Sequence, residues 1–295
     1  MFDEVIFNAS KKHLEEFISV DINIDEELDF HANANYLKAF FMGFTLFASA
    51  PFVNYNYDYK GNIEYIFHEG TGRNSYLLII GHGVASNMDE PIIQKLAEKV
   101  AEQGMSVLRF SFPGNGSSGG RFDQCTMTKE IEDLQCIVTA VKERGWRPIY
   151  AGHSMGASVG ALTAAVDSRI EFLISLAGIA NTKNFFESEF AMLTPGKDNM
   201  WNEETCPLSQ EFADDITQIN SIVPRVSGVE IPWLLIHGKR DDVISCKESQ
   251  SLVTNFEKTR ELVEIEGADH LFSGDALHLA TESVIDWLGR KLQSN

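Results

Sequence analysis

The sequence predicts an α/β protein with a mostly parallel central sheet and helices on both faces. From residue 61 onward, short runs of β-forming residues alternate with longer amphipathic runs. Most of the short runs are apolar at nearly every position, as expected of strands that are buried on both faces of a parallel sheet. Strands are predicted at residues 76–80, 106–110, 148–151, 172–175, 233–236 and 262–265.

The runs between these strands carry the spacing and end signals of helices. In the first of them Asp89 is expected to cap the helix, Pro91 suits the first turn, and Gly104 ends the run. Ser245 and Glu248 have the spacing of a capping box and are expected to open a later helix. Regular alternation of this kind favours helices on both faces of one sheet.

Two regions fall outside the alternation. Residues 1–60 are predicted to be an N-terminal extension, partly helical, that packs on a core domain at residues 61–295. Within it, the apolar run at residues 39–53 is shorter than the roughly 20 residues that span a bilayer; it predicts either a buried helix or a surface for a lipid-like substrate, a membrane or another subunit. Residues 178–230 are rich in Phe, Met and Trp and predict a cap or lid, or else an ordinary helical excursion.

Charge and cysteine content argue against several classes of partner. The chain has 43 acidic and 24 basic residues, a formal charge of −19 that disfavours nucleic acid and anionic membranes. The four cysteines form no C-x-x-C pair, which predicts free thiols in a reducing compartment and no zinc site. Acids stand at the N-terminus where a secretory signal has Lys or Arg. A cytoplasmic protein without stable membrane insertion is expected, and homo-oligomerisation is left open.

The loop after the strand at 106–110 contains G-x-G-x-x-G, from Gly114 to Gly119. A dinucleotide site needs such glycines to lead directly into a helix, with an acid about 20 residues later at the end of the next strand. Here a polar run delays the helix, and the acids near that distance, Glu132 and Asp133, lie inside a helical pattern. The glycines are therefore interpreted as a tight connection, and no dinucleotide cofactor is expected.

A second glycine motif has the setting that the first one lacks. G-H-S-M-G at residues 152–156 directly follows a predicted strand and precedes a helical run of small residues. A strand, a sharp turn and an immediate helix form the nucleophile elbow that exposes a serine hydroxyl. Ser154 is therefore the candidate nucleophile.

A serine hydroxyl needs a base to take its proton and a carboxylate to orient that base. In this fold the acid precedes the histidine, and each lies in a loop at the carboxyl end of a strand. His270 follows the strand at 262–265 and is the predicted base. Asp241 follows the strand at 233–236 and is the predicted carboxylate, with its neighbour Asp242 as the alternative.

The developing oxyanion in acyl transfer needs two hydrogen-bond donors. One is the amide that follows the nucleophile, here that of Met155. The other is expected from the loop after the strand at 76–80, where the amide of Val84, or that of Ala85, is the candidate.

Together these motifs resemble the α/β-hydrolase superfamily. The matching elements are HGVA at 82–85, GHSMG at 152–156, HGKRDDV at 237–243 and EGADHLF at 266–272. The C-terminal segment and the HG loop further resemble bacterial cinnamoyl and feruloyl esterases and the serine-aminopeptidase-like group near monoglyceride lipases. The resemblance implies a serine hydrolase, of carboxylesterase type, that needs no metal or organic cofactor.

The chain departs from this family in the loop after the strand at 106–110. Many such hydrolases carry D-x-R-G-x-G-x-S there, whereas this chain has Ser111 and Pro113 in place of the acid and the arginine. The departure is expected to remove a structural ion pair and to leave the serine chemistry intact. The resemblance does not extend to residues 1–60.

The resemblance implies a small-molecule carboxylic ester or thioester as substrate. The aromatic residues of 178–230 favour an apolar or aromatic acyl group. A peptidase or an acyltransferase with the same residues is the alternative, because a triad specifies acyl transfer and not the leaving group. A non-catalytic binding protein on this fold is a third, less favoured, interpretation.

Overall fold

The computed structural model describes residues 63–72, 75–254, 256 and 258–293. All of these residues belong to one compact unit, Ala50–Asn295. The predicted extension at 1–60, including the apolar run at 39–53, lies outside the described residues.

A seven-stranded sheet forms the centre of the described unit, in the order β1-β3-β2-β4-β5-β6-β7. Only β1 is antiparallel to its neighbour, and the other pairs are parallel. The six predicted strands are present, and β1 is an edge strand that the apolar pattern did not predict. The strands are β1 Tyr65–His68, β2 Tyr76–Gly81, β3 Ser106–Phe110, β4 Arg147–His153, β5 Phe172–Leu176, β6 Trp233–Gly238 and β7 Arg260–Ile265.

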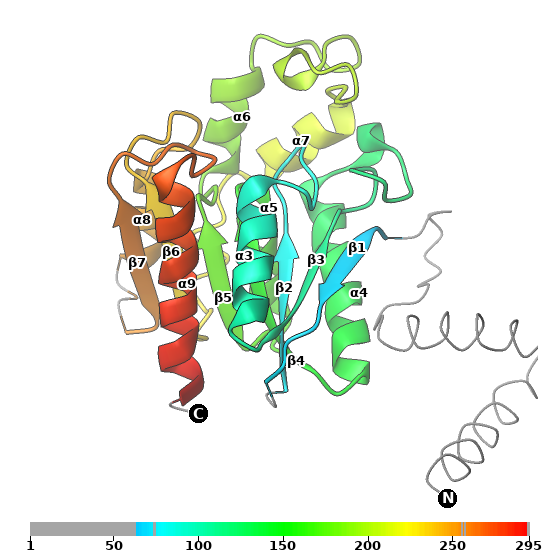
Figure 1. Ribbon diagram of the computed structural model, residues 1–295. Coiled ribbons are helices and arrows are strands. Elements are labelled where there is room, and N and C mark those ends of the chain that lie inside the picture. The colour runs from blue at the N-terminus through cyan, green and yellow to red at the C-terminus, as the bar shows by residue number, and fades with distance from the viewer. Residues whose placement is uncertain (1–62, 73–74, 255, 257, 294–295) are drawn as a thin grey trace, which may run out of the picture. The chain divides into compact units, whose positions relative to one another are not determined.

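Helices cover both faces of the sheet, as predicted (Figure 1). Alternate side chains of β2 show why: Leu78 and Ile80 belong to a core with α3 and α9, whereas Leu77 and Ile79 belong to a core with α4 and α5. The helices are α3 Pro91–Glu102, α4 Met127–Glu143, α5 Met155–Val166, α6 Thr182–Phe190, α7 Gln210–Ile219, α8 Lys247–Val253 and α9 Asp275–Gln293, with short 3₁₀ turns η1 Phe122–Gln124 and η2 Met200–Asn202.

Two predicted helix caps are wrong, because tertiary contacts use the side chains elsewhere. Helix α3 begins at Pro91 with Glu90 as its N-cap residue, and Asp89 instead pairs with Arg109 at 2.5 Å. Helix α8 begins at Lys247 without a side-chain cap, so the Ser245–Glu248 capping box does not form. The Glu248 carboxylate instead accepts hydrogen bonds from the backbone amides just before α6.

The long connection between β5 and β6 contains α6, η2 and α7 and lies beyond the carboxyl ends of the strands (Figure 1). Phe190 lies at its centre, fully buried, with its ring in edge contact with Phe185, Trp201 and others. Helix α7 is joined to the start of α4, where the Thr128 hydroxyl donates to Asp215 at 2.5 Å. Residues of this connection are thereby held above the edge of the sheet where the predicted site lies.

The glycine loop after β3 is hydrogen-bonded to Glu64, the residue that precedes β1. The Ser111 hydroxyl donates to the Glu64 carboxylate at 3.0 Å, and the amide of Ser117 donates to it at 2.8 Å. Gly116 has a φ of 56°, and a Cβ there would lie 2.7 Å from the same carboxylate oxygen. The hydrolases that this chain resembles often have an acid within this loop, at the position of Ser111. In this chain Glu64 supplies a carboxylate to the loop. The following helix α4 begins only at Met127, so its N-terminus is not formed by the glycines.

Candidate active site

Ser154 lies at a strained turn between β4 and α5. Its φ of 54° and ψ of −123° are unusual for a residue with a side chain, and helix α5 begins at the next residue. A Cβ on Gly152 would lie 2.4 Å from the backbone of Gly156, and a Cβ on Gly156 would lie 2.2 Å from the carbonyl oxygen of His82. Both flanking glycines are therefore required for the turn to pack.

The fold brings Ser154, His270 and Asp241 together from three separate loops. The Nε2 atom of His270 lies 3.1 Å from the Ser154 hydroxyl oxygen, and its Nδ1 atom lies 2.9 Å from Oδ2 of Asp241. Ser154 and His270 are buried, at 5% and 8% exposure. In this order the imidazole can accept the hydroxyl proton, and the carboxylate can hold the ring in place and stabilise its charged form.

The Asp241 carboxylate is surrounded by donors and its side chain is fully buried. Its Oδ2 faces His270 and also Nε2 of His237 at 3.1 Å. Its Oδ1 accepts from the backbone amides of Val243 at 3.0 Å and Ile244 at 2.7 Å. Burial by itself raises the pKa of Asp241, but the hydrogen bonds from His237 and His270 outweigh burial and hold this pKa well below its ordinary value.

Asp242, the alternative carboxylate, is exposed and lines the rim of the pocket above Ser154. The structure therefore pairs His270 with Asp241.

His237 is a contact of this site that the sequence reasoning missed. Its ring is fully buried, with Nδ1 at 2.8 Å from the Ser249 hydroxyl and Nε2 at 2.8 Å from the carbonyl oxygen of Ile244. Because Nε2 faces only acceptors, Ile244 O and Asp241 Oδ2, it carries the proton. The His237-Gly238 pair at the end of β6 was the signal in the sequence that could have indicated this contact. His237 and His270 thus contact the same oxygen of Asp241.

Hydrogen bonds of the buried His82 ring fix the conformation of the loop after β2. This ring is completely buried, and burial lowers its pKa to about 4, so it is neutral. The amide of Phe112 donates to Nε2 at 2.8 Å, which places the proton on Nδ1, and Nδ1 donates to the carbonyl oxygen of Gly83 at 2.7 Å. In a trans peptide the N–H points away from the carbonyl oxygen, so the Val84 amide is directed away from His82.

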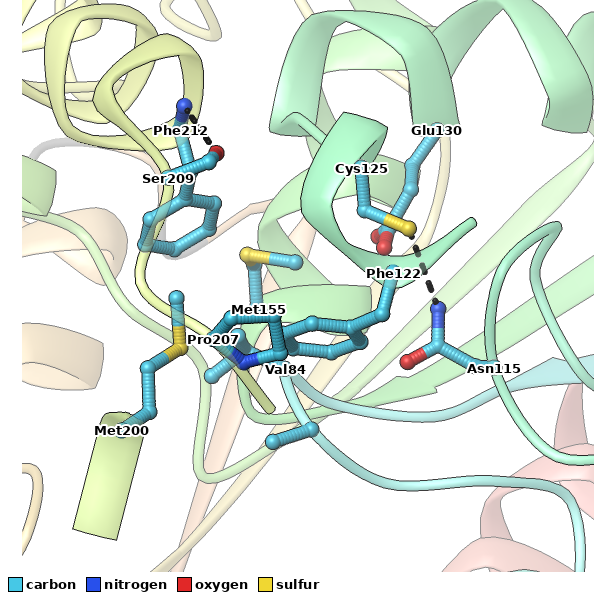
Figure 2. A pocket seen from close by; sticks show the side chains of 11 residues that line it. Val84, Asn115, Phe122, Cys125, Glu130, Met155, Met200, Pro207, Ser209 and Phe212 are labelled. Atoms are coloured by element: carbon cyan, nitrogen blue, oxygen red, sulfur yellow. Dashed lines mark hydrogen bonds between the residues drawn. The ribbon is translucent and has the colours of Figure 1, made fainter. Parts of the chain in front are cut away.

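The same loop passes directly over the serine. A Cβ on Gly83 would lie 2.8 Å from Cβ of Ser154. Val84 and Ala85 line the pocket that contains Ser154, and together with Met155 they also line a neighbouring cavity (Figure 2); Val84 and Met155 are the predicted oxyanion donors. The arrangement fits two amide donors beside the Ser154 hydroxyl, with Val84 placed by the His82–Gly83 hydrogen bond.

A buried ion pair between His153 and Glu90 contacts the backbone of His270. Nδ1 of His153 lies 3.1 Å from Oε2 of Glu90, and its Nε2 lies 2.9 Å from the backbone carbonyl oxygen of His270. Since both partners are acceptors, both ring nitrogens of His153 carry a proton and the ring is charged. Burial lowers the pKa of His153, but the Glu90 charge outweighs it and raises the pKa; His153 in turn lowers the pKa of Glu90 against the effect of burial. The sequence reasoning assigned no role to either residue.

We expect Glu90→Gln to alter the pH dependence of stability. The pKa of His153 in the folded state is raised above 6.5, so its contribution is fully present below pH 6.5 and is lost as the pH rises through the folded value. Without the Glu90 charge this contribution falls, by roughly 3 kcal/mol at pH 6, the usual cost of breaking a buried ion pair. Thermal unfolding between pH 6 and 9 measures both effects.

The control for this prediction is Glu102→Gln, which changes an exposed acid of the same helix. The variant Glu90→Gln should unfold at a lower temperature than the wild type at pH 6, and its unfolding temperature should decline less as the pH rises. The neighbouring titratable groups, His82 and Asp241, are the same in both proteins. Parallel pH profiles for Glu90→Gln and the wild type would contradict the ion pair.

An open pocket of about 370 Å³ lies above Ser154, within the range of small-molecule sites. Phe185 and Trp201 from the β5–β6 connection line it, and so does Leu271, which is 53% exposed. Its charged lining comprises the Glu90–His153 ion pair and the carboxylates of Asp242 and Asp269, which leave a net negative charge. The pocket therefore combines apolar walls with negative charge.

Other features of the described residues bear on the chemistry. They contain no group of three or more His, Cys, Asp or Glu side chains that could hold a metal ion. No helix among them has the length and apolar character needed to cross a bilayer. None of the four cysteines, all of which lie among these residues, forms a disulfide.

Residues 72–197 match the family model described as serine aminopeptidase, S33. Among curated proteins, an acyl transferase of Photobacterium leiognathi is 23% identical over 214 residues, covering 68% of this chain and 67% of the relative. The mitochondrial palmitoyl-protein thioesterase ABHD10 of Mus musculus is 28% identical over 183 residues, covering 57% of this chain and 59% of the relative. The chain thus spans less than two thirds of the thioesterase.

Solved structures agree on the fold. The ferulic-acid complex of Est1E from Butyrivibrio proteoclasticus superposes with a TM-score of 0.71 at 23% identity, over 79% of this chain and 96% of that chain. Mouse ABHD10 superposes with a TM-score of 0.67 at 21% identity, over 80% of this chain and 97% of that chain. The predicted fold class and family resemblance are therefore confirmed. The chain has the fold of the α/β-hydrolases and is similar to esterase-like and serine-aminopeptidase-like proteins.

Proposed function

We propose that the protein is a serine hydrolase that cleaves a carboxylic ester through an acyl-enzyme intermediate. The observation that carries the proposal is the chain of contacts from the Ser154 hydroxyl to Nε2 of His270 at 3.1 Å and from Nδ1 of His270 to Asp241 at 2.9 Å. These distances lie within the reach of nucleophile and base in acyl-transfer enzymes.

In this mechanism Ser154 attacks the acyl carbonyl carbon while Nε2 of His270 accepts the hydroxyl proton. Asp241 keeps the other ring proton on Nδ1 and stabilises the imidazolium that forms. The amides of Met155 and Val84 donate to the oxyanion of the tetrahedral intermediate. His270 then gives its proton to the leaving alcohol, and water, activated by the same base, releases the acid from Ser154.

The pocket favours a neutral substrate. Asp242 and Asp269 border it, and the whole chain carries a formal charge of −19, so an anionic leaving group would be repelled. Phe185, Trp201 and Leu271 offer apolar contact. A small neutral ester with an apolar or aromatic acyl part fits these features. No residue proposed for the reaction calls for a metal or an organic cofactor.

Thioester hydrolysis or acyl transfer is the second candidate, and it is favoured by the relatives named as a palmitoyl-protein thioesterase and an acyl transferase. The same residues serve each reaction, because only the leaving group or the acceptor differs. The acidic rim opposes an anionic acyl carrier, whereas a neutral thioester meets no such obstacle.

The proposal is tested with a fluorophosphonate probe and a panel of substrates. Mass spectrometry should locate the probe on the peptide that contains Ser154. The panel comprises p-nitrophenyl esters of graded acyl length, hydroxycinnamate esters, a neutral thioester and aminoacyl anilides. Ester turnover supports the proposal and anilide turnover alone supports a peptidase. Absence of both labelling and turnover would refute it and favour a binding protein.

A further inference from the structure

One carboxylate oxygen, Oε2 of Glu90, joins two parts of the candidate site. The Ser86 hydroxyl donates to it at 3.1 Å, and Nδ1 of His153 lies 3.1 Å from the same oxygen. Ser86 ends the loop of residues 82–86, called the oxyanion loop below, and His153 directly precedes Ser154 in the chain. Glu90 therefore contacts both the oxyanion loop and the strained turn of the candidate nucleophile.

The oxyanion loop is fixed at both of its ends. At its start the buried His82 ring donates to a carbonyl oxygen of the loop at 2.7 Å, and at its end Ser86 donates to the carboxylate. Between these bonds Ala85 has a φ of 53°, a left-handed conformation that a residue with a side chain keeps only where its surroundings impose it. The bond from Ser86 helps to impose it, and it thereby holds the neighbouring amide of Val84 in place.

On its other side Glu90 is connected to the base through His153. Nε2 of His153 donates to the backbone carbonyl oxygen of His270 at 2.9 Å, and the centroids of the two rings lie 4.9 Å apart. The side chains of His153 and Glu90 are 2% and 11% exposed, so water competes little for these bonds. Because Glu90 keeps the His153 ring charged, both ring nitrogens can donate at the same time, which a neutral ring cannot do.

Acyl transfer needs the oxyanion donors and the base at fixed places around the Ser154 hydroxyl at the same moment. The oxyanion loop follows β2, whereas His270 follows β7, at a distant place in the sheet order. A chain of three hydrogen bonds through Glu90 and His153 connects these two loops. A shift of either loop relative to the other would have to break or stretch one of these bonds.

We propose that Glu90 is a positioning residue that holds the oxyanion loop and His270 in register for the chemical step. The inference rests on the proposed function, because it concerns the attack of Ser154 on an ester. Binding of the substrate depends mainly on the apolar walls of the open pocket. Loss of this connection should therefore lower kcat and leave KM within a few-fold of its wild-type value.

Ser86→Ala tests the loop side of the connection and leaves the Glu90–His153 ion pair in place. It removes the hydroxyl that binds Glu90, so kcat for the best ester of the panel should fall roughly tenfold, the scale of one hydrogen bond to a charged group. Ser86→Thr is the matched variant, because it keeps a hydroxyl at the same position, and it should retain most of the wild-type kcat. Steady-state kinetics gives kcat and KM separately for each protein.

Glu90→Met removes the acceptor of both bonds and keeps a side chain of similar length. Its kcat should fall by roughly a hundredfold, the effect of a displacement of about 1 Å in an active site. Because Ser86 acts through Glu90, the double variant Ser86→Ala/Glu90→Met should be no slower than Glu90→Met alone, whereas independent effects would multiply. Glu102→Met makes the same change at an exposed acid of α3 and should have wild-type kinetics. Circular dichroism checks that each variant is folded.

A rise in KM with unchanged kcat in Ser86→Ala would show that Ser86 binds the substrate, and it would overturn the proposal. Equal losses of kcat in Ser86→Ala and Ser86→Thr, an unchanged kcat in folded Glu90→Met, or multiplied losses in the double variant would overturn it as well. If Glu90→Met does not fold, the two Ser86 variants decide the matter. Failure of the proposed function gives a different result, because the wild type then hydrolyses no ester and the probe does not label Ser154.

Discussion

Ser154→Ala is expected to lower kcat for ester hydrolysis by about a million-fold, the scale found when the nucleophile of a triad is removed. His270 then has no hydroxyl to deprotonate, although the oxyanion amides and the pocket are unchanged. Alanine fits the turn at Ser154, since it only removes the hydroxyl oxygen. Rates are measured with the best ester of the panel, together with labelling by the fluorophosphonate probe.

The matched control is Ser188→Ala, which alters an exposed serine on α6. It should retain full activity and probe labelling. Turnover and labelling that survive in Ser154→Ala would show that another residue is the nucleophile.

Asp241→Asn is expected to lower kcat by roughly ten-thousand-fold, as loss of the orienting carboxylate does in other triads. The amides of Val243 and Ile244 hold one side-chain oxygen at 3.0 and 2.7 Å, so the oxygen of an asparagine would stay there. Its NH₂ group would then face Nδ1 of His270. Nδ1 would have to accept, which places the ring proton on Nε2 and leaves no atom to take the proton of Ser154.

Asp242→Asn is the matched control, because it makes the same carboxylate-to-amide change at the exposed residue next to Asp241. Its kcat should stay within a few-fold of the wild-type value, as for other substitutions away from the reacting groups. Steady-state kinetics of the two variants side by side is the measurement. Equal losses, or a greater loss in Asp242→Asn, would contradict the pairing of His270 with Asp241.

Much of the fold could be predicted because its signals are local. Buried parallel strands are continuous apolar runs, so six strands were identified within a few residues. β1 was missed since it is short and half-exposed, and such an edge strand has no continuous apolar pattern. The caps at Asp89 and Ser245 were predicted from sequence spacing alone. In the structure Asp89 pairs with Arg109, and Glu248, the other member of the predicted capping box, binds the backbone before α6.

The candidate triad could be predicted because each member follows a strand, and the carboxyl ends of parallel strands meet at one edge of the sheet. The contacts around it could not be predicted. His153 and Glu90 are 63 residues apart in sequence, and nothing local to either residue indicates their pairing. His237 stood in a recognised motif, but its contact with Asp241 depends on how the loop after β6 folds back.

The sequence by itself determined where six strands lie along the chain, which serine is flanked by glycines, and that the acid precedes the histidine. These features follow from local hydrophobicity and turn chemistry. The choice of Asp241 over Asp242 required the tertiary structure, since adjacent residues differ only in which one the backbone turns inward. The same holds for Glu130, which reads as a surface acid on an amphipathic helix. The tertiary structure leaves its side chain only 3% exposed, and this burial raises its pKa well above the ordinary value.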